Sequence, residues 1–174
     1  MKNYFLIILL FFSISPSYGE ELTIEEKKKI SEEVKSMLDA FNKGDAQKLL
    51  DKTHPSIYAL SGGKEKFEQQ MLLVVKQAMQ LKIKFEKFEV RLPGKLYKSG
   101  EHLVCFIPRS SIFIVDGKKI ASESYFIAAK TEGSEWKYLD GGGMRGAPQK
   151  IYQYFPDLPK VLELPDNTVE LVKP

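Results

Sequence analysis

One stretch constrains the fold of this chain more than any other: Leu103 to Asp140, LVCFIPRSSIFIVDGKKIASESYFIAAKTEGSEWKYLD. Two runs rich in β-branched and aromatic residues meet at Asp116-Gly117, a dipeptide that hairpin turns favour because both residues tolerate positive φ. A second turn at Glu132-Gly133-Ser134 reverses the chain again. The stretch therefore predicts three consecutive antiparallel strands.

The first turn also predicts the register of the hairpin. If Val115 pairs with Lys118, then Arg109 pairs with Ser124, and every second side chain lies on the same face. One face carries Phe113, Ser111, Arg109, Ile107 and Cys105 with their partners, and the other carries Ile112, Ser110, Pro108 and Phe106 with theirs. Both faces are largely apolar, which is expected when one face lies against a helix and the other curls round a cavity or a partner chain.

Polar residues interrupt the hairpin in mid-strand: Arg109, Ser110, Ser111, Ser122, Glu123 and Ser124. Pro108 cannot donate a hydrogen bond to a neighbouring strand, so we expect a bulge or an edge position there. Such a bulge would shift the register and bring Arg109 to Glu123.

The turn at 132–134 leaves two registers open for the third strand. A three-residue loop places Asp140 beside Phe126, on the face of Arg109. A two-residue loop places Asp140 beside Ile127, on the face of Glu123.

Residues 1–19 are predicted to be a signal peptide. Lys2 supplies a positive charge, Tyr4 to Phe12 is an unbroken apolar run, and Ser17-Tyr18-Gly19 offers small residues for cleavage. The run is shorter than the roughly 20 residues that span a bilayer, and no cysteine directly follows it for a lipid anchor. We therefore expect the mature chain to be exported, periplasmic or secreted, with no membrane anchor.

Composition and charge argue against several classes of partner and ligand. The net charge is only +3 and the basic residues are interspersed, which argues against nucleic acid and anionic membranes as partners. The single cysteine, Cys105, lies in an apolar strand and is predicted to be a buried small hydrophobe. His54 and His102 have no further ligands at metal-binding spacing, so we expect no metal and no cofactor.

Helices are predicted to precede the sheet. A capping box at Thr23–Glu26 begins the first helix, and Lys43-Gly44 ends it. The segments that follow are predicted as a short helix from Asp45 through Leu50, a short strand from Ile57 to Leu60, a longer helix after Gly62-Gly63, and a strand from Lys82 to Leu92 with a bulge near Glu86-Lys87. The buried stripe of the longer helix is predicted to hold Phe67, Met71, Val74, Val75, Ala78 and Met79.

This order predicts an α+β domain over residues 20–146, in which N-terminal helices pack on one side of a strongly bent antiparallel sheet. Residues 147–174 are predicted to form a short helix through Tyr154 and then an extended tail. The tail, with four prolines, is too rich in proline for a helix, and its leucines are expected to pack on the domain.

Two segments, MLDAFNKGDAQKLLDKTHPSIYALSGGKEKFEQQM and SYFIAAKTEGSEWKYLDGG, together with the element order, resemble the nuclear-transport-factor-2-like superfamily. The resemblance covers roughly residues 23–145. More narrowly, the chain looks like secreted bacterial members, which share the HPSIYALSGGKEKF type of stretch and the FPDLPKVLELP type of tail. The resemblance implies a cone-shaped, cystatin-like fold whose mouth or interior holds a ligand. The catalytic acids of its isomerases match no motif in this sequence.

The first functional hypothesis is therefore a binding module. It would hold a small, partly apolar or amphipathic molecule in the cone, or a protein partner on the sheet. The residues expected to contact a ligand are Tyr58, Arg109, Ser111, Ser124, Tyr125 and Trp136.

The alternative is an enzyme of the isomerase, dehydratase or cyclase type. Glu123 or Asp140 would be the general base, and Tyr58 or Tyr125 would stabilise the oxyanion. His54 is a further catalytic candidate, because its loop enters the predicted short strand.

Association is the last expectation. Two apolar faces leave more surface than the helices can cover, which predicts a two-fold homodimer through the face of Phe106 and Tyr125. The competing prediction is that residues 155–164 fold back over that face and keep the chain monomeric.

Overall fold

The computed structural model describes residues 21–172, so the predicted signal peptide lies outside the described residues. The fold is α+β, with four α-helices, two 3₁₀ helices and one six-stranded antiparallel sheet. The helices are α1 (Ile24–Lys43), α2 (Ala46–Lys52), α3 (Ser56–Leu60), α4 (Lys64–Gln80), η1 (Gly141–Met144) and η2 (Pro148–Gln153). The strands are β1 (Lys84–Val90), β2 (Leu96–Ser99), β3 (His102–Val115), β4 (Lys118–Lys130), β5 (Lys137–Asp140) and β6 (Thr168–Leu171).

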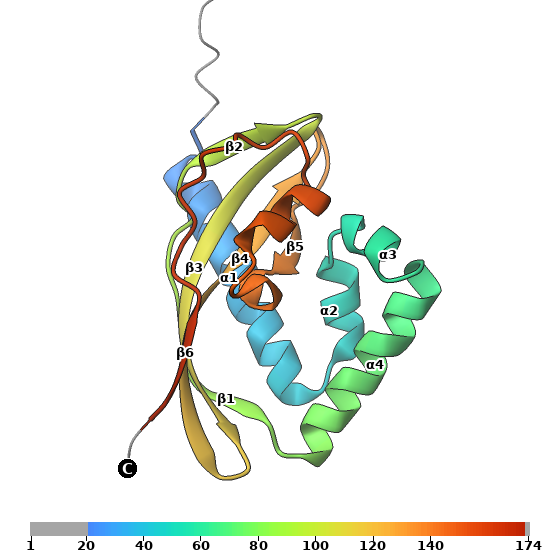
Figure 1. Ribbon diagram of the computed structural model, residues 1–174, viewed down its shortest axis with the longest axis vertical. Helices are drawn as coiled ribbons and strands as arrows, with labels where there is room; N and C mark the ends of the chain where they lie inside the picture. Colours follow the sequence, from blue (N-terminus) through green and yellow to red (C-terminus); the bar gives the residue numbers. More distant parts are fainter. Residues whose placement is uncertain (1–20, 173–174) are drawn as a thin grey trace, which may run out of the picture.

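Strands β3 and β4 form the centre of the sheet (Figure 1). Their pairing runs without interruption from Leu103↔Lys130 to Val115↔Lys118, which confirms the predicted register. β1 and β2 lie one after the other along β3, while β5 and β6 lie one after the other along β4. Phe126 pairs with Asp140, so the three-residue-loop register is the correct one.

The bulge expected at Pro108 is absent from the pairing of β3 with β4, whereas the alternative, a position without a neighbouring strand, agrees with the structure. Pro108 lies where β1 has ended and β2 has not begun, and its carbonyl accepts a hydrogen bond from the Arg91 N–H at 2.9 Å. A missing N–H costs little at such a gap, because no strand there waits for a donor.

The bulge expected in the first strand is confirmed. The register of β1 against β3 shifts between Phe85 and Lys87. The side chain of Asn42, near the end of α1, accepts from the Phe85 N–H at 2.8 Å and donates to the Phe85 carbonyl at 2.9 Å. Helix α1 thus satisfies both backbone groups of Phe85 on the free edge of β1.

The main core lies between the helices and one face of the sheet. Thr23 and Glu26 form the predicted capping box of α1, and Gly44 ends the helix at φ 74°. Buried side chains of α1 then pack against Cys105, Ile107 and other residues of the Arg109 face. Cys105 is fully buried, as predicted, and burial raises its pKa to about 12.

Two predictions about the helical half are wrong. The short apolar run from Ile57 to Leu60 lies in helix α3 rather than in a strand. In α4, Phe67, Val75 and Ala78 are buried, whereas Val74 and Met79 are exposed. Successive residues of a helix point about 100° apart, and the buried side of α4 is narrow, so Val75 faces the core while Val74 faces away from it.

The C-terminal segment covers part of the opposite face. Phe155 and Leu158 are buried there against a group of sheet residues that includes Phe106 and Tyr125. The segment continues to β6, which pairs with β4 at Ile120 to Glu123 (Figure 1, red). The part of this face around Phe106 and Tyr125, expected to form a homodimer, is therefore covered by the protein's own chain, as the competing prediction placed it.

Every helix within residues 21–172 is too short or too polar to cross a bilayer.

Candidate functional site

The helix-facing side of the sheet carries a polar group in an apolar surround. Arg109 pairs with Ser124 across β3 and β4, and Ser111 pairs with Ser122, as predicted. All four residues are buried. Buried polar side chains normally have hydrogen-bond partners, and only some of these four residues have one.

Arg109 is held by Asp140 and by two aromatic rings. Its Nη2 donates to the two carboxylate oxygens of Asp140, at 2.9 and 3.2 Å. The guanidinium lies 5.5 Å from the ring centre of Phe85 and 5.1 Å from that of Phe126, which are cation–π distances. Asp140 also accepts from the Gly142 N–H at 2.7 Å, so its carboxylate is fixed from two sides.

Three buried polar atoms near this pair have no hydrogen-bond partner among residues 21–172: Arg109 Nε, Ser111 Oγ and Ser124 Oγ. They belong to neighbouring positions on one face of the sheet. Leaving a buried donor or acceptor unpaired costs about 1–3 kcal/mol, so such a group calls for a water molecule or a ligand.

An apolar cavity of about 370 Å³ lies between the helices and this face of the sheet; we call it the inner cavity. Side chains from α1, α2, α3 and α4 line it on one side and side chains from β1, β4 and β5 on the other. The residues are Met37, Leu38, Phe41, Leu49, Thr53, Ile57, Phe67, Met71, Phe85, Phe126, Tyr138, Leu139 and Asp140. Its volume lies within the range of roughly 300–1,000 Å³ that small-molecule sites occupy.

A second hollow of about 210 Å³ shares Phe41 and Phe85 with the inner cavity; we call it the polar pocket. It is lined by Phe41, Ile83, Lys84, Phe85, Arg109, Ser111, Phe113, Ser122 and Arg145. Lys84 and Arg145 are exposed and Arg109 and Ser111 are buried, so positive charge extends from the mouth of the pocket to its floor.

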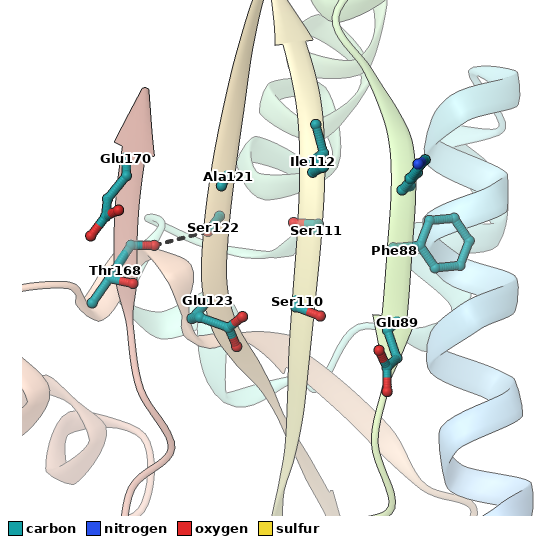
Figure 2. Close-up of a pocket in the computed structure, with 11 residues that line it drawn as sticks. Phe88, Glu89, Ser110, Ser111, Ile112, Ala121, Ser122, Glu123, Thr168 and Glu170 are labelled. Carbon is teal, nitrogen blue, oxygen red and sulfur yellow. Dashed lines mark hydrogen bonds between the residues drawn. The ribbon is translucent and has the colours of Figure 1, made fainter. Parts of the chain in front are cut away.

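A larger hollow of about 610 Å³ lies on the other side of the sheet, beside the C-terminal segment; we call it the outer trough. Glu89, Ser110, Glu123 and Thr168 form one row across four strands (Figure 2). Glu123 pairs here with Arg91 at 2.7 Å, so the predicted contact of Arg109 with Glu123 is wrong. Because both partners are about half exposed, this pair belongs to a solvated surface.

Of the residues predicted from sequence, only Arg109, Ser111 and Asp140 line the two hollows on the helix-facing side. Ser124 is buried behind them, with its hydroxyl near Gly142. Glu123 lies on the opposite face, in the outer trough.

The remaining predicted residues lie elsewhere. Tyr58 is in α3 and packs against Phe67, with ring centres 5.6 Å apart. Tyr125 is buried under the C-terminal segment, and burial together with the charge of Asp140 raises its pKa. Trp136 is buried in the main core with Lys130 over its ring.

His54 lies outside the inner cavity as well. Its Nδ1 faces the hydroxyl of Ser56 at 2.8 Å, and its ring packs against His102 and Phe155. Burial, with a smaller contribution from His102, lowers the pKa of His54 to about 4.

Sequence reasoning missed several lining residues, including Phe41, Met71, Phe85 and Arg145. The first three belong to apolar patterns that also describe an ordinary core, so their spacing carries no sign of a cavity. Arg145 lies two residues after the glycine triplet and belongs to no periodic pattern. The sequence therefore carries no signal that it lines a pocket.

Residues 21–172 contain no group of three or more His, Cys, Asp or Glu side chains arranged to hold a metal ion. Comparisons with protein-family models, curated proteins and solved structures give no match.

Proposed function

We propose that the protein is an exported, single-domain member of the nuclear-transport-factor-2-like superfamily that binds a small, partly apolar molecule in the inner cavity. In this proposal the sheet bends around the cavity as one wall of a cone. The observation that supports it most directly is the inner cavity itself: an apolar space of about 370 Å³ beside buried polar atoms that lack partners.

Two features favour this cavity over the larger outer trough. Apolar and aromatic side chains from six or more elements converge on it, as is typical of ligand sites. The outer trough, in contrast, is lined mostly by charged and small polar residues, and the ion pair of Glu123 with Arg91 beside it faces solvent.

Binding is also better supported than acid–base catalysis. Of the predicted bases, Asp140 alone lines the inner cavity, and Arg109 and the Gly142 N–H already engage its carboxylate. The tyrosine on the cavity wall is Tyr138, whose hydroxyl donates to Glu33 at 2.8 Å. An isomerase-type mechanism needs a free base and a free hydroxyl that point at one substrate.

The test is a thermal-shift screen of the chain from residue 20 onward against lipids, sterols and metabolites. We expect at least one compound to raise the Tm, because a ligand that binds only the folded state stabilises it. Met71→Trp should fill the cavity and abolish that shift. Leu72→Trp is the matched control, since Leu72 is 51% exposed on the same helix.

A flat response of the wild type to every compound would overturn the proposal. Equal shifts for the wild type and Met71→Trp would also overturn it, because the ligand would then lie outside the inner cavity.

A further inference from the structure

We infer that the ligand is an anionic amphiphile: its apolar part occupies the inner cavity and its anionic head occupies the polar pocket. This inference rests on the proposed function and specifies its ligand class. The two hollows adjoin at the rings of Phe41 and Phe85, whose centres lie 5.5 Å apart, and the inference places one molecule across both.

Charge in the polar pocket is of one sign. Three of its lining residues are cationic, namely Lys84, Arg109 and Arg145, and none is acidic. Asp140 offsets Arg109, but no ion pair within residues 21–172 involves Lys84 or Arg145. A net positive hollow with partly apolar walls favours an anion over a cation or a neutral group.

The unpaired atoms point to the same class. The side chain of Arg109 is only 7% exposed, and its Nε, a donor, has no acceptor among the described residues. The Ser111 hydroxyl, in the same pocket, is also unpaired and can donate. A carboxylate or sulfate oxygen accepts from several donors at once, and hydrogen bonds that involve a charged group are the stronger ones.

The exposure of the lining residues predicts the order in which the head group contacts them. Lys84 and Arg145 lie at the mouth of the pocket, where they attract the anion, and Ser111 and Arg109 lie at its floor. Asp140 lines the inner cavity with its carboxylate on Arg109, so it disfavours an anion there and directs the head group to the polar pocket.

The experiment compares three probes of equal chain length: octanoate, octan-1-ol and octyltrimethylammonium. Dissociation constants are measured by calorimetry with the chain from residue 20 onward. We expect octanoate to bind about tenfold more tightly than octan-1-ol, the effect of one charged hydrogen bond, and the cation to bind least. Added salt should weaken the binding of octanoate and leave the affinity for octan-1-ol unchanged.

Variants locate the head group. Arg145→Gln and Ser111→Ala should each remove most of the preference for octanoate without changing the affinity for octan-1-ol. Lys150→Gln is the control for lost positive charge, because Lys150 is exposed on η2 and does not line the pocket. Arg145 is also exposed, so its substitution leaves the core intact.

The outcomes separate the two proposals. Equal binding of octanoate and octan-1-ol, or tighter binding of the cation, would overturn the inference and leave the proposed function standing. A preference for octanoate that survives both Arg145→Gln and Ser111→Ala would also overturn it. Absence of binding by octanoate would overturn the inference, while the proposed function would be overturned only by the thermal-shift screen, through a flat response or through equal shifts for the wild type and Met71→Trp.

Discussion

A single glycine determines how the chain leaves the sheet at the end of β5. A Cβ atom built on Gly141 would overlap the ring of Tyr125, which is itself buried to 1% exposure. Two residues further on, a Cβ atom at Gly143 would meet no atom within 4 Å. Gly141 therefore requires glycine for packing, whereas Gly143 does not.

We predict that Gly141→Ala lowers the free energy of unfolding by about 1–3 kcal/mol, the usual cost of overpacking. Gly143→Ala, in the same 3₁₀ turn, should change it by less than about 0.5 kcal/mol. Urea denaturation of both variants checks this. Equal losses in the two variants would contradict the role assigned to the close contact between Gly141 and Tyr125.

His54 makes stability depend on pH. Burial, aided by His102, lowers its pKa from 6.5 to about 4, so on acidification the unfolded chain binds this proton before the folded one does. The stability that neutral His54 contributes is thus present above pH 6.5 and is lost as the pH falls toward 4.

We expect this loss to be about 2 kcal/mol, after a discount for solvent screening. Denaturation of the wild type at pH 7 and pH 4 measures the total change, and His54→Gln, which cannot titrate, should show a smaller one. An NMR titration that placed the pKa of His54 near 6.5 would contradict the prediction.

At the scale of elements, the edge of β1 is held by one side chain of α1. Asn42 satisfies both backbone groups of Phe85, beside the bulge and on the wall of the inner cavity. We predict that Asn42→Ala costs about 1–3 kcal/mol, because it leaves two part-buried backbone groups unpaired. Gln47→Ala, which removes an exposed side-chain contact on α2, is the control.

Amide hydrogen exchange supplies the specific readout for that substitution. The Phe85 N–H should lose protection in Asn42→Ala and keep it in Gln47→Ala. Unchanged protection of Phe85 would contradict the role assigned to Asn42.

The elements differ in how well the sequence predicts them. The hairpin register followed from Asp116-Gly117, and the β1 bulge followed from a change of phase between Phe85 and Phe88, because both are local signals. The run from Ile57 to Leu60 was mistaken for a strand because four apolar residues fit either period. Pro55 before it was a usable sign of a helix start.

The candidate site was less predictable than the fold. Arg109 and Ser111 were found because polar residues stand out in apolar strands. The sequence did not determine whether Asp140 lies on the same face, because the turn at residues 132–134 allows two registers. The apolar wall of the cavity is assembled from six or more separated elements, and only the tertiary structure brings these together.

At the scale of the whole molecule, the two faces of the sheet are covered differently. Helices cover the Arg109 face and the inner cavity, while the C-terminal segment covers the part of the other face around Phe106 and Tyr125. The exposed apolar residues of α4 are Leu72, Leu73, Val74 and Met79. Leu72 and Met79, seven residues apart, lie on one side of the helix, while Leu73 and Val74 point about 100° and 200° away from it. The apolar surface expected to favour a dimer, around Phe106 and Tyr125, is covered by Phe155 and Leu158 of the C-terminal segment.

We therefore predict that the chain from residue 20 onward sediments as a monomer at micromolar concentration. Deletion of residues 155–174 removes Phe155 and Leu158 and uncovers the sheet residues Tyr97, Val104, Phe106, Tyr125 and Ile127. Each large side chain that returns to water costs roughly 1.5–3 kcal/mol, so this variant should dimerise or aggregate.

Deletion of residues 166–174 alone is the matched comparison. It removes β6, whose residues are all exposed, but leaves Phe155 and Leu158 in place, so this variant should remain monomeric. A full-length dimer would contradict the prediction directly. If the shorter deletion associated as strongly as the longer one, the prediction would also be contradicted. In that case β6, and not Phe155 and Leu158, would prevent association of the protein.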